Sequence, residues 1–457
     1  MKKIIFILFL SVSTIANAQN ADTSIIKSLY AEALSDETAY KNLEFLCTKI
    51  GGRLCGSPQA AAGLEWAKQV MNSIGMDTVY TQKIFVHHWD RGEKEKASIA
   101  SKVFGSKDVN ICALGESVGT PMEGVNAEVI EVFSLEQLKK LGKKQITGKI
   151  VFFNKPMNPE YYNTFEAYGD VADIRFNGAS EAAKYGAVGM IIRSLTLLTD
   201  DYPHTGIMDY DTSITKIPAV AISTRDADVL SSWLKTDYEL IFHFKTNCKF
   251  YPETESYNLI GEIKGSEKPD EIITIGGHID SWDLGQGAHD DGVGCVQTLE
   301  VARLFRDLQI KPKHTIRFVM FMDEECAQRG GRKYAVLAKE KNEKHIAAIE
   351  SDAGGFTPVG FEMKTSIDTV NIIAKWKDLF LPYGIYQFEK GWGGVDIGFM
   401  INRGIPLIEL MTDSQRYFDY QHAGNDTFDK VNKREMQLGS ASIAALTYLI
   451  DKYGFVK

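Results

Sequence analysis

The sequence has few cysteines, no surplus of positive charge and no long apolar run after its first residues, and each shortage excludes a class of protein. Six cysteines in 457 residues are too few for a scaffold held together by disulfides. A net charge of −9 does not suit a protein whose main partner is nucleic acid, because binding to phosphates needs clustered cations. Beyond the N-terminus, no segment reaches the ~20 apolar residues of a membrane-spanning helix. The sequence also has no internal repeat and no low-complexity tract.

The composition is that of an ordinary globular protein, with 44% hydrophobic and 24% charged residues. At about 150 residues per domain, the length allows about three units. These figures indicate a globular protein of several units, and the chemistry must be inferred from the motifs.

The first residues have the form of a bacterial signal peptide. Lys2 and Lys3 precede the short apolar run 4–10, and an A-N-A triplet follows at 16–18. A basic start, a short apolar core and an A-x-A site are the three parts of a secretory signal. We therefore predict that residues 1–18 are removed and that the mature protein is exported to the bacterial periplasm or the medium, with no membrane attachment.

An exported chain meets oxidising conditions, so its cysteines are candidates for disulfides. Two pairings stay open from the sequence: Cys47 with Cys55, and Cys112 with Cys248. The remaining two cysteines, Cys295 and Cys326, lie in apolar surroundings, and we expect them to be free thiols.

Three segments follow the predicted signal peptide. Residues 19–119 hold two helical patterns around a glycine-rich turn, and then strand-like pieces. In 120–250, short strands alternate with a helix, and the loops are rich in Gly, Asp and Tyr. In 251–457, strands and helices alternate regularly, which predicts an α/β fold with a mainly parallel sheet flanked by helices. We therefore predict one catalytic domain, 19–119 plus 251–457, that is interrupted by a smaller, β-rich, largely non-catalytic domain.

Residue types that bind metals follow four successive predicted strands. In an open α/β sheet, ligands bind just beyond the carboxyl ends of the strands, so these side chains should converge. They are His278, Asp280 and Asp290 after the strand 272–275, Glu324 and Glu325 after 315–322, Asp352 after 346–350, and His422 after 406–411.

This mixture of residues suits a hydrolytic zinc site. Zn²⁺ binds imidazole nitrogen and carboxylate oxygen, and a pair of zinc ions needs a carboxylate that bridges them. A further carboxylate that is not a ligand must take the proton of the attacking water and return it to the leaving amine. The adjacent Glu324 and Glu325 can divide these two roles. Asp280 suits a supporting role, accepting the second ring N–H of His278.

The stretch 276–292, GGHIDSWDLGQGAHDDG, resembles the signature of the dizinc exopeptidases of the aminopeptidase type, in their carboxypeptidase Q-like branch. Glu324-Glu325, Asp352 and the HAGNDT run at 422–427 occur in the family's order, and the similarity extends upstream to 51–58 and 89–92. It covers nearly the whole mature chain. The segment 120–250, with IPAVAI at 217–222, resembles the protease-associated domain that such exopeptidases carry as an insertion.

The resemblance implies two zinc ions per chain, a zinc-exopeptidase fold and a short peptide substrate. It implies that Asp290 bridges the ions, that His278 and Asp352 complete one site, and that Glu325 and His422 complete the other.

The same resemblance implies that Glu324 is the general base and acid and that Asp280 supports the first histidine. It also suggests a homodimer. Some related exopeptidases have a tyrosine directly before the last histidine ligand, where this chain has Gln421, so the donor to the oxyanion stays unassigned. Relatives can have a Ser-Asp-His run near the substrate, where this chain has Asp396.

Three alternatives remain beside the exopeptidase. The GESVG run at 115–119 matches the Gly-x-Ser-x-Gly elbow of serine hydrolases, with Ser117 as the nucleophile, but Pro121 and Gly124 oppose the helix that an elbow requires. A single-zinc glutaminyl-peptide cyclase has a similar fold, and the complete ligand set favours two metals instead. A metal-free binding module is the third alternative, and the intact ligand set opposes it.

Overall fold

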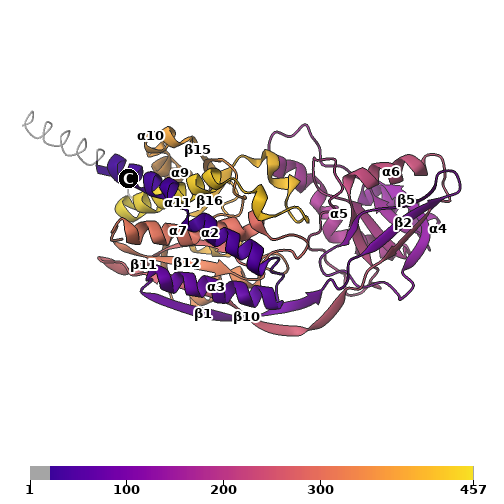
Figure 1. The fold of residues 1–457 in the computed structure, drawn as a ribbon, viewed down its shortest axis with the longest axis horizontal. Coiled ribbons are helices and arrows are strands. Elements are labelled where there is room, and N and C mark those ends of the chain that lie inside the picture. The colour runs from indigo at the N-terminus through magenta and orange to yellow at the C-terminus, as the bar shows by residue number, and fades with distance from the viewer. Residues whose placement is uncertain (1–20, 456–457) are drawn as a thin grey trace, which may run out of the picture.

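Two eight-stranded sheets, one in each half of an elongated molecule, organise the fold (Figure 1). The structure is a computed structural model that describes residues 21–455, so the predicted signal peptide at 1–18 lies outside the described residues. Among the described residues, no helix combines the length and the apolar character that crossing a membrane requires.

The first sheet holds the strands that sequence alternation predicts in the C-terminal half. Its four central strands, β12, β11, β13 and β16, run parallel to one another. β10 pairs antiparallel with β1 and β12, and β14 pairs antiparallel with β16 and parallel with β15. In spatial order the strands are β1 (Thr78–Asp90), β10 (Lys249–Ile263), β12 (His314–Phe321), β11 (Lys268–His278), β13 (Lys344–Glu350), β16 (Leu407–Thr412), β14 (Pro358–Lys364) and β15 (Gln387–Lys390).

Helices cover both faces of this sheet. Side chains of a strand alternate between faces, so Phe318 of β12 joins the cluster with Leu299 of α7, whereas Val319 joins the cluster with Tyr334 of α8. All eight residues of β12 are buried, as expected of a central parallel strand. The helices are a first one over residues 21–35, then α2 (Thr38–Phe45), α3 (Pro58–Ile74), α7 (Val293–Asp307), α8 (Arg329–Glu340), α9 (Ile367–Ala374), α10 (Lys377–Phe380) and α11 (Lys433–Tyr453).

The start of α3 shows how local sequence sets an element. The hydroxyl of Ser57 accepts a hydrogen bond from the backbone N–H of Ala60 at 3.1 Å, and Pro58 occupies the first helical position. Both features are favoured at a helix N-terminus. Gly75 ends the helix with φ of 77°, a conformation that costs glycine little. The glycine-rich turn 51–58 is therefore the lead into this helix.

The second sheet has parallel strands at its centre and three helices around it. In order its strands are β3 (Gly105–Asp108), β2 (Lys96–Ser101), β9 (Ile241–Lys245), β5 (Val125–Val132), β6 (Ile150–Phe153), β7 (Gly189–Arg193), β8 (Ala219–Ile222) and β4 (Ile111–Ala113). The helices are α4 (Leu135–Ile146), α5 (Thr164–Lys184) and α6 (Thr224–Leu234). Three strands of this sheet, β2, β3 and β4, precede residue 120, and the other five follow it. The domain boundary at residue 120 stays a prediction.

Most predicted elements of the C-terminal half appear with shifts of a few residues. The helix expected over residues 24–47 is divided, because residues 36 and 37 are not helical. The helix expected near residues 179–185 is the last part of the much longer α5. Six strands were not predicted: β2, β3, β9, β10, β14 and β15. Of these only β3 and β15 lie at the edge of a sheet.

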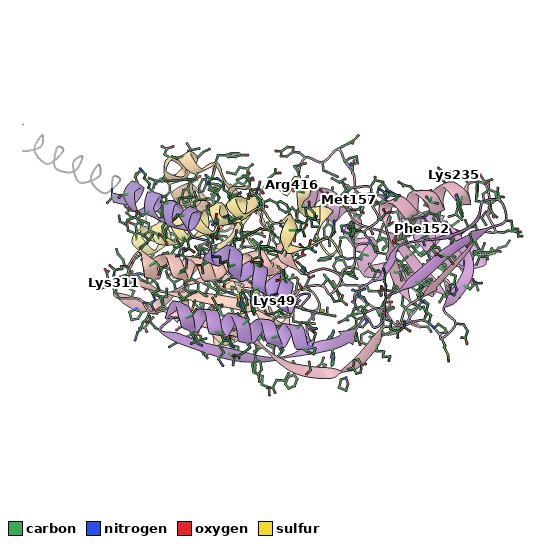
Figure 2. All side chains as sticks on the ribbon, viewed as in Figure 1. Lys49, Phe152, Met157, Lys235, Lys311 and Arg416 are labelled. Atoms are coloured by element: carbon green, nitrogen blue, oxygen red, sulfur yellow. The ribbon has the colours of Figure 1, made fainter. Side chains whose placement is uncertain are left out.

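Side chains fill the interior of both halves (Figure 2), with Phe152 inside the second half and Lys311 at the far end of the first. Arg91, just after β1, ties the halves together. Its guanidinium binds both carboxylate oxygens of Asp283 at 2.7–2.9 Å and the backbone oxygen of Ala113 at 2.6 Å. It also lies 3.4 Å from the hydroxyl of Thr205. A planar guanidinium that binds a carboxylate with two nitrogens fixes direction as well as distance.

Replacing Glu343 is expected to remove a contribution to stability that the fold has at neutral pH and loses in acid. Arg317 donates two hydrogen bonds to its carboxylate, at 2.8 and 3.2 Å, and His345 lies 3.0 Å away. Despite the opposing effect of burial, these partners lower the pKa of Glu343 from 4.5 to about 2. A lowered pKa stabilises the fold above pH 4.5, and this contribution disappears as the pH falls from 4.5 to 2.

Urea unfolding between pH 7 and pH 2 checks this prediction. Glu343→Gln should lower the free energy of unfolding at neutral pH and flatten its decline below pH 4.5. The exposed Glu340→Gln is the control and should leave the curve unchanged. An unaltered pH profile in Glu343→Gln would contradict the assignment.

Candidate metal centre

The seven predicted site residues stand where the strands of the first sheet end. His278 is the last residue of β11, and Glu324 and Glu325 follow β12. The others lie in turns and loops: Asp280 after β11, Asp290 before α7, Asp352 after β13, and His422 after the short helix Ser414–Asp419. Five of the seven side chains form two groups that could each hold a metal ion. Glu324 lies beside the first group, and the backbone oxygen of Asp280 contacts His278.

Two groups of ligand atoms share Asp290. In the first, Nε2 of His278 lies 3.2 Å from Oδ1 of Asp290 and 3.4 Å from Oδ1 of Asp352. In the second, Nε2 of His422 lies 3.3 Å from Oδ2 of Asp290 and 3.1 Å from Oε2 of Glu325. The two carboxylate oxygens of Asp290 therefore face different histidines. Two ligand atoms on one tetrahedral zinc stand roughly 3.3 Å apart, so each group has the spacing of a zinc site.

The donor atoms fit metal ions better than they fit one another. Nε2 of His278, Oδ1 of Asp352 and Oε1 of Glu325 are buried without a hydrogen-bond partner. Buried polar atoms normally have a partner, so atoms left unpaired at one point indicate a missing ligand. Imidazole nitrogen and carboxylate oxygen are the donors that zinc prefers.

The electrostatics of the site also demand cations. Burial opposes a charged imidazole, yet Asp352, Asp290 and Glu324 together raise the pKa of His278 well above its ordinary value. Burial, with the charges of Asp352 and Glu325, raises the pKa of Glu324 well above that of a free glutamate. Crowded carboxylates repel one another in a dry site, and divalent cations remove that repulsion.

The role predicted for Asp280 is corrected by its contacts. The ring Nδ1 of His278 lies 3.0 Å from the backbone oxygen of Asp280, while the nearer carboxylate oxygen is 3.9 Å away. The carboxylate instead accepts the backbone N–H groups of residues 323, 324 and 325, at 2.8, 3.3 and 3.3 Å. Asp280 thus orients His278 through its main chain and holds the turn with the paired glutamates through its side chain. The sequence could not show which oxygen of Asp280 contacts His278, because the backbone oxygen and the carboxylate belong to the same residue.

Two further carboxylates position the ligands and were not predicted. Asp291 accepts the backbone N–H of His278 at 3.0 Å and that of Gly294 at 2.8 Å. Asp426 accepts the backbone N–H groups of His289 and Asp290, at 2.8 and 3.2 Å. Both belong to the motifs 276–292 and 422–427, so their place in the motifs was the only available signal.

Arg53, in the glycine-rich turn, supports the loop that follows His278, and the sequence did not predict this role. Its side chain is completely buried and donates to four backbone oxygens, at 2.6–3.0 Å, of Gly51, Ile279, Gln286 and Gly287. The loop after His278 is therefore tied to the N-terminal part of the same domain.

The serine-hydrolase alternative does not fit the structure. Ser117 is fully buried, its hydroxyl donates to the backbone oxygen of Val118, and it accepts the N–H of Ala219 at 2.9 Å. No helix follows in residues 118–124. Ser117 holds the turn into β5 and is not a nucleophile.

The two positions that differ from the related exopeptidases also have defined places. The side-chain nitrogen of Gln421 lies 3.0 Å from Nε2 of His422, at the face of the second ligand group. Asp396 is fully buried, and its backbone N–H donates to Glu350 at 3.2 Å.

A segment between β7 and β8 of the second sheet lies against the last histidine. The backbone N–H of Thr205 donates to the oxygen of His422 at 2.9 Å, and His204 forms a bridge with Ala423. Nδ1 of His204 lies 2.7 Å from the oxygen of Gln421. A small pocket beside this contact is lined by Trp282, Gly285, Gly287, Asp290, Glu325, His422, Ala423 and Asp426. The second sheet therefore contributes a wall to the site.

Known peptidases resemble this chain in sequence and in fold. The model of Peptidase family M28 matches residues 258–447. Carboxypeptidase Q of Bos taurus is 33% identical over 95% of this chain and 90% of its own length. The crystal structure of a Peptidase M28 precursor from Shewanella amazonensis SB2B is 35% identical with a TM-score of 0.90, covering 94% of this chain and 97% of its own. A zinc aminopeptidase from Bacillus subtilis, 20% identical, shares the fold with a TM-score of 0.65 over 90% of this chain and 94% of its own.

Proposed function

Because the chain belongs to peptidase family M28, we propose that it is an exported exopeptidase that uses two zinc ions to hydrolyse dipeptides or other short peptides with a free N-terminus. The observation that carries the two-metal proposal is the division of Asp290 between His278 and His422.

In this proposal the ligands are assigned to the two groups that the geometry separates. His278 and Asp352 hold one zinc ion, Glu325 and His422 hold the other, and Asp290 bridges them. Zinc bound here supplies a Lewis acid for the scissile carbonyl and activates water.

Glu324 is left to move the proton. It is not a member of either ligand group, and its Oε2 lies 4.0 Å from Nε2 of His278. A carboxylate at this place takes a proton from the attacking water and returns it to the leaving amine. Asp280 sets its position, since the same carboxylate binds the N–H groups of both glutamates.

The preference for short peptides rests on the wall that the second sheet provides. The Thr205–His422 hydrogen bond and the His204–Ala423 bridge place backbone directly beside a ligand. A site closed on one side accepts a chain end more readily than the middle of a long chain. We assign residues 120–250 to a protease-associated domain that forms this wall. We also propose that the protein is a homodimer.

A panel of metal-loaded assays tests the function. The full mature chain, loaded with zinc, should cleave free dipeptides and should cleave N-acetylated analogues at least tenfold more slowly. Cleavage of acetylated and free peptides at equal rates would contradict the need for a free amine. One zinc ion per chain, together with formation of pyroglutamate from an N-terminal glutamine peptide, would favour the cyclase. Binding without hydrolysis by zinc-loaded protein would favour the binding module.

A further inference from the structure

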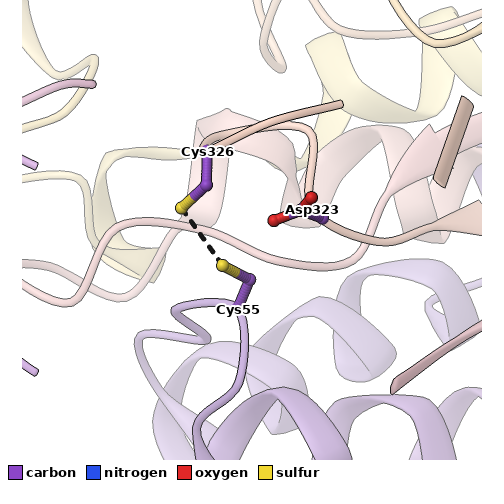
Figure 3. A group of neighbouring side chains, drawn as sticks. All are labelled: Cys55, Asp323 and Cys326. Carbon is purple, nitrogen blue, oxygen red and sulfur yellow. Dashed lines mark hydrogen bonds between the residues drawn. The ribbon is translucent and has the colours of Figure 1, made fainter. Parts of the chain in front are cut away.

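Two cysteines far apart in the sequence lie in contact beside the candidate metal centre. The Sγ atoms of Cys55 and Cys326 are 3.1 Å apart, although 271 positions separate the residues (Figure 3). The sequence had left Cys55 open to pairing with Cys47 and had placed Cys326 among the free thiols. Both cysteines are free in the structure, and the expected partner of Cys55 is replaced by Cys326.

We propose that Cys55 and Cys326 are a disulfide-forming pair that fastens the glutamate turn of the active site to the N-terminal part of the catalytic domain. Neither cysteine belongs to the two ligand groups around Asp290. The pair is therefore a modification site separate from the proposed zinc centre, and it does not depend on the proposed function.

Both backbones are held in place, so the thiol contact follows from the fold. Cys55 precedes Gly56, whose position against the backbone of His87 leaves no room for a side chain, since a Cβ there would lie 2.7 Å from the His87 oxygen. Cys326 directly follows Glu325 in the turn that the Asp280 carboxylate binds. The same turn is closed by a hydrogen bond from the N–H of Gln328 to the oxygen of Asp323 at 2.6 Å.

The distance between the sulfurs favours a disulfide over a metal site. A disulfide bond is about 2.05 Å long, whereas two thiolates on one tetrahedral zinc stand roughly 3.8 Å apart. At 3.1 Å the sulfurs are already closer than two zinc ligands. The carboxylate of Asp323 lies beside them and completes a group of three ligand-type residues, one fewer than a structural zinc site uses.

Oxidation needs only a disulfide as the co-reactant, either a small-molecule disulfide or that of a thiol–disulfide oxidoreductase. Cys326 is partly exposed and Cys55 is buried, so the Cys326 thiolate attacks the oxidant's disulfide and one of its sulfurs leaves as a thiol. The Cys55 thiolate then attacks the Cys326 sulfur of the mixed disulfide, and the second thiol leaves. The two cysteines lose two protons and two electrons, and the oxidant gains both.

The bond would join the turn before α3 to the turn that carries Glu324 and Glu325. Cross-linking residues so distant in sequence restricts the unfolded chain strongly. It also holds Glu325 against local opening. We therefore expect oxidation to raise the melting temperature by several degrees and to slow zinc loss to a chelator several-fold.

The test uses the full mature chain, loaded with zinc, and either oxidised or reduced glutathione. After alkylation and proteolysis, mass spectrometry should find the Cys55 and Cys326 peptides joined in the oxidised protein and separate in the reduced protein. Cys112→Ala, which removes a thiol from the second sheet, should keep the joined peptide. The double variant Cys55→Ser/Cys326→Ser should lose both the joined peptide and the redox dependence of the melting temperature.

Three results would overturn the proposal. They are unlinked thiols at high oxidised glutathione, the same oxidation-dependent melting shift in the double variant, and an additional zinc ion per chain that Cys55→Ser removes. None of these measurements depends on peptide hydrolysis, so they remain decisive if the proposed activity fails.

Discussion

Glu324→Gln is expected to lower kcat about 10²- to 10⁴-fold while the protein keeps its full zinc content. The amide has nearly the size of the carboxylate but cannot take the proton of the attacking water. Glu324 lies outside both ligand groups, so its loss should leave the donors around Asp290 unchanged. The measurements are steady-state kinetics on a dipeptide and metal analysis of the same preparation.

The matched control is the same substitution one residue later. Glu325→Gln replaces a carboxylate that faces Nε2 of His422 at 3.1 Å, so it should mainly reduce the zinc content. The backbone N–H groups of Glu324 and Glu325 both donate to Asp280, so the two substitutions are made in equally supported backbone. If Glu324→Gln lost zinc and Glu325→Gln kept it, the two roles would be reversed.

Asp290→Ala is expected to abolish both metal sites at once, and activity with them. Its two oxygens face His278 at 3.2 Å and His422 at 3.3 Å, and among the described residues it is the one member that the two groups share. Removing it leaves each group with one histidine and one carboxylate. Metal analysis should show the zinc content falling from two ions per chain towards none, and added zinc should not restore hydrolysis.

Asp352→Ala provides the contrast for this prediction. Asp352 belongs only to the group of His278, so this variant should lose one zinc ion and keep the other. Circular dichroism of both variants would show that the fold persists. Two zinc ions retained by Asp290→Ala would refute the bridge.

The convergence of the seven candidate site residues could be predicted because its signal is local. Each of the seven residues follows a strand or opens a helix, and parallel strands bring their carboxyl ends to one edge of the sheet. Their convergence could therefore be expected from the chain alone, whereas the grouping of His278, Asp290 and Asp352 was implied by the family resemblance. The strands that carry them are buried and strongly apolar, which makes their positions readable to within a few residues.

The supporting residues could not be predicted, because their roles depend on backbone atoms. Arg53 binds four backbone oxygens, and Asp426 accepts the N–H groups of His289 and Asp290. Any sequence offers many arginines and aspartates, and main-chain atoms leave no mark of their contacts in the sequence. For the same reason the predicted contact between Asp280 and His278 is made by the backbone oxygen of Asp280 and not by its carboxylate.

Periodicity and motif spacing are local properties of the chain, and they were enough to predict the family, the α/β alternation and the residue types that converge at one edge of the first sheet. Coordinates were needed to show that each oxygen of Asp290 faces a different histidine, that Asp280 acts through two different groups, and that Cys55 faces Cys326. These depend on contacts between residues far apart in the chain, whose geometry is set by packing of the whole domain and not by any local pattern.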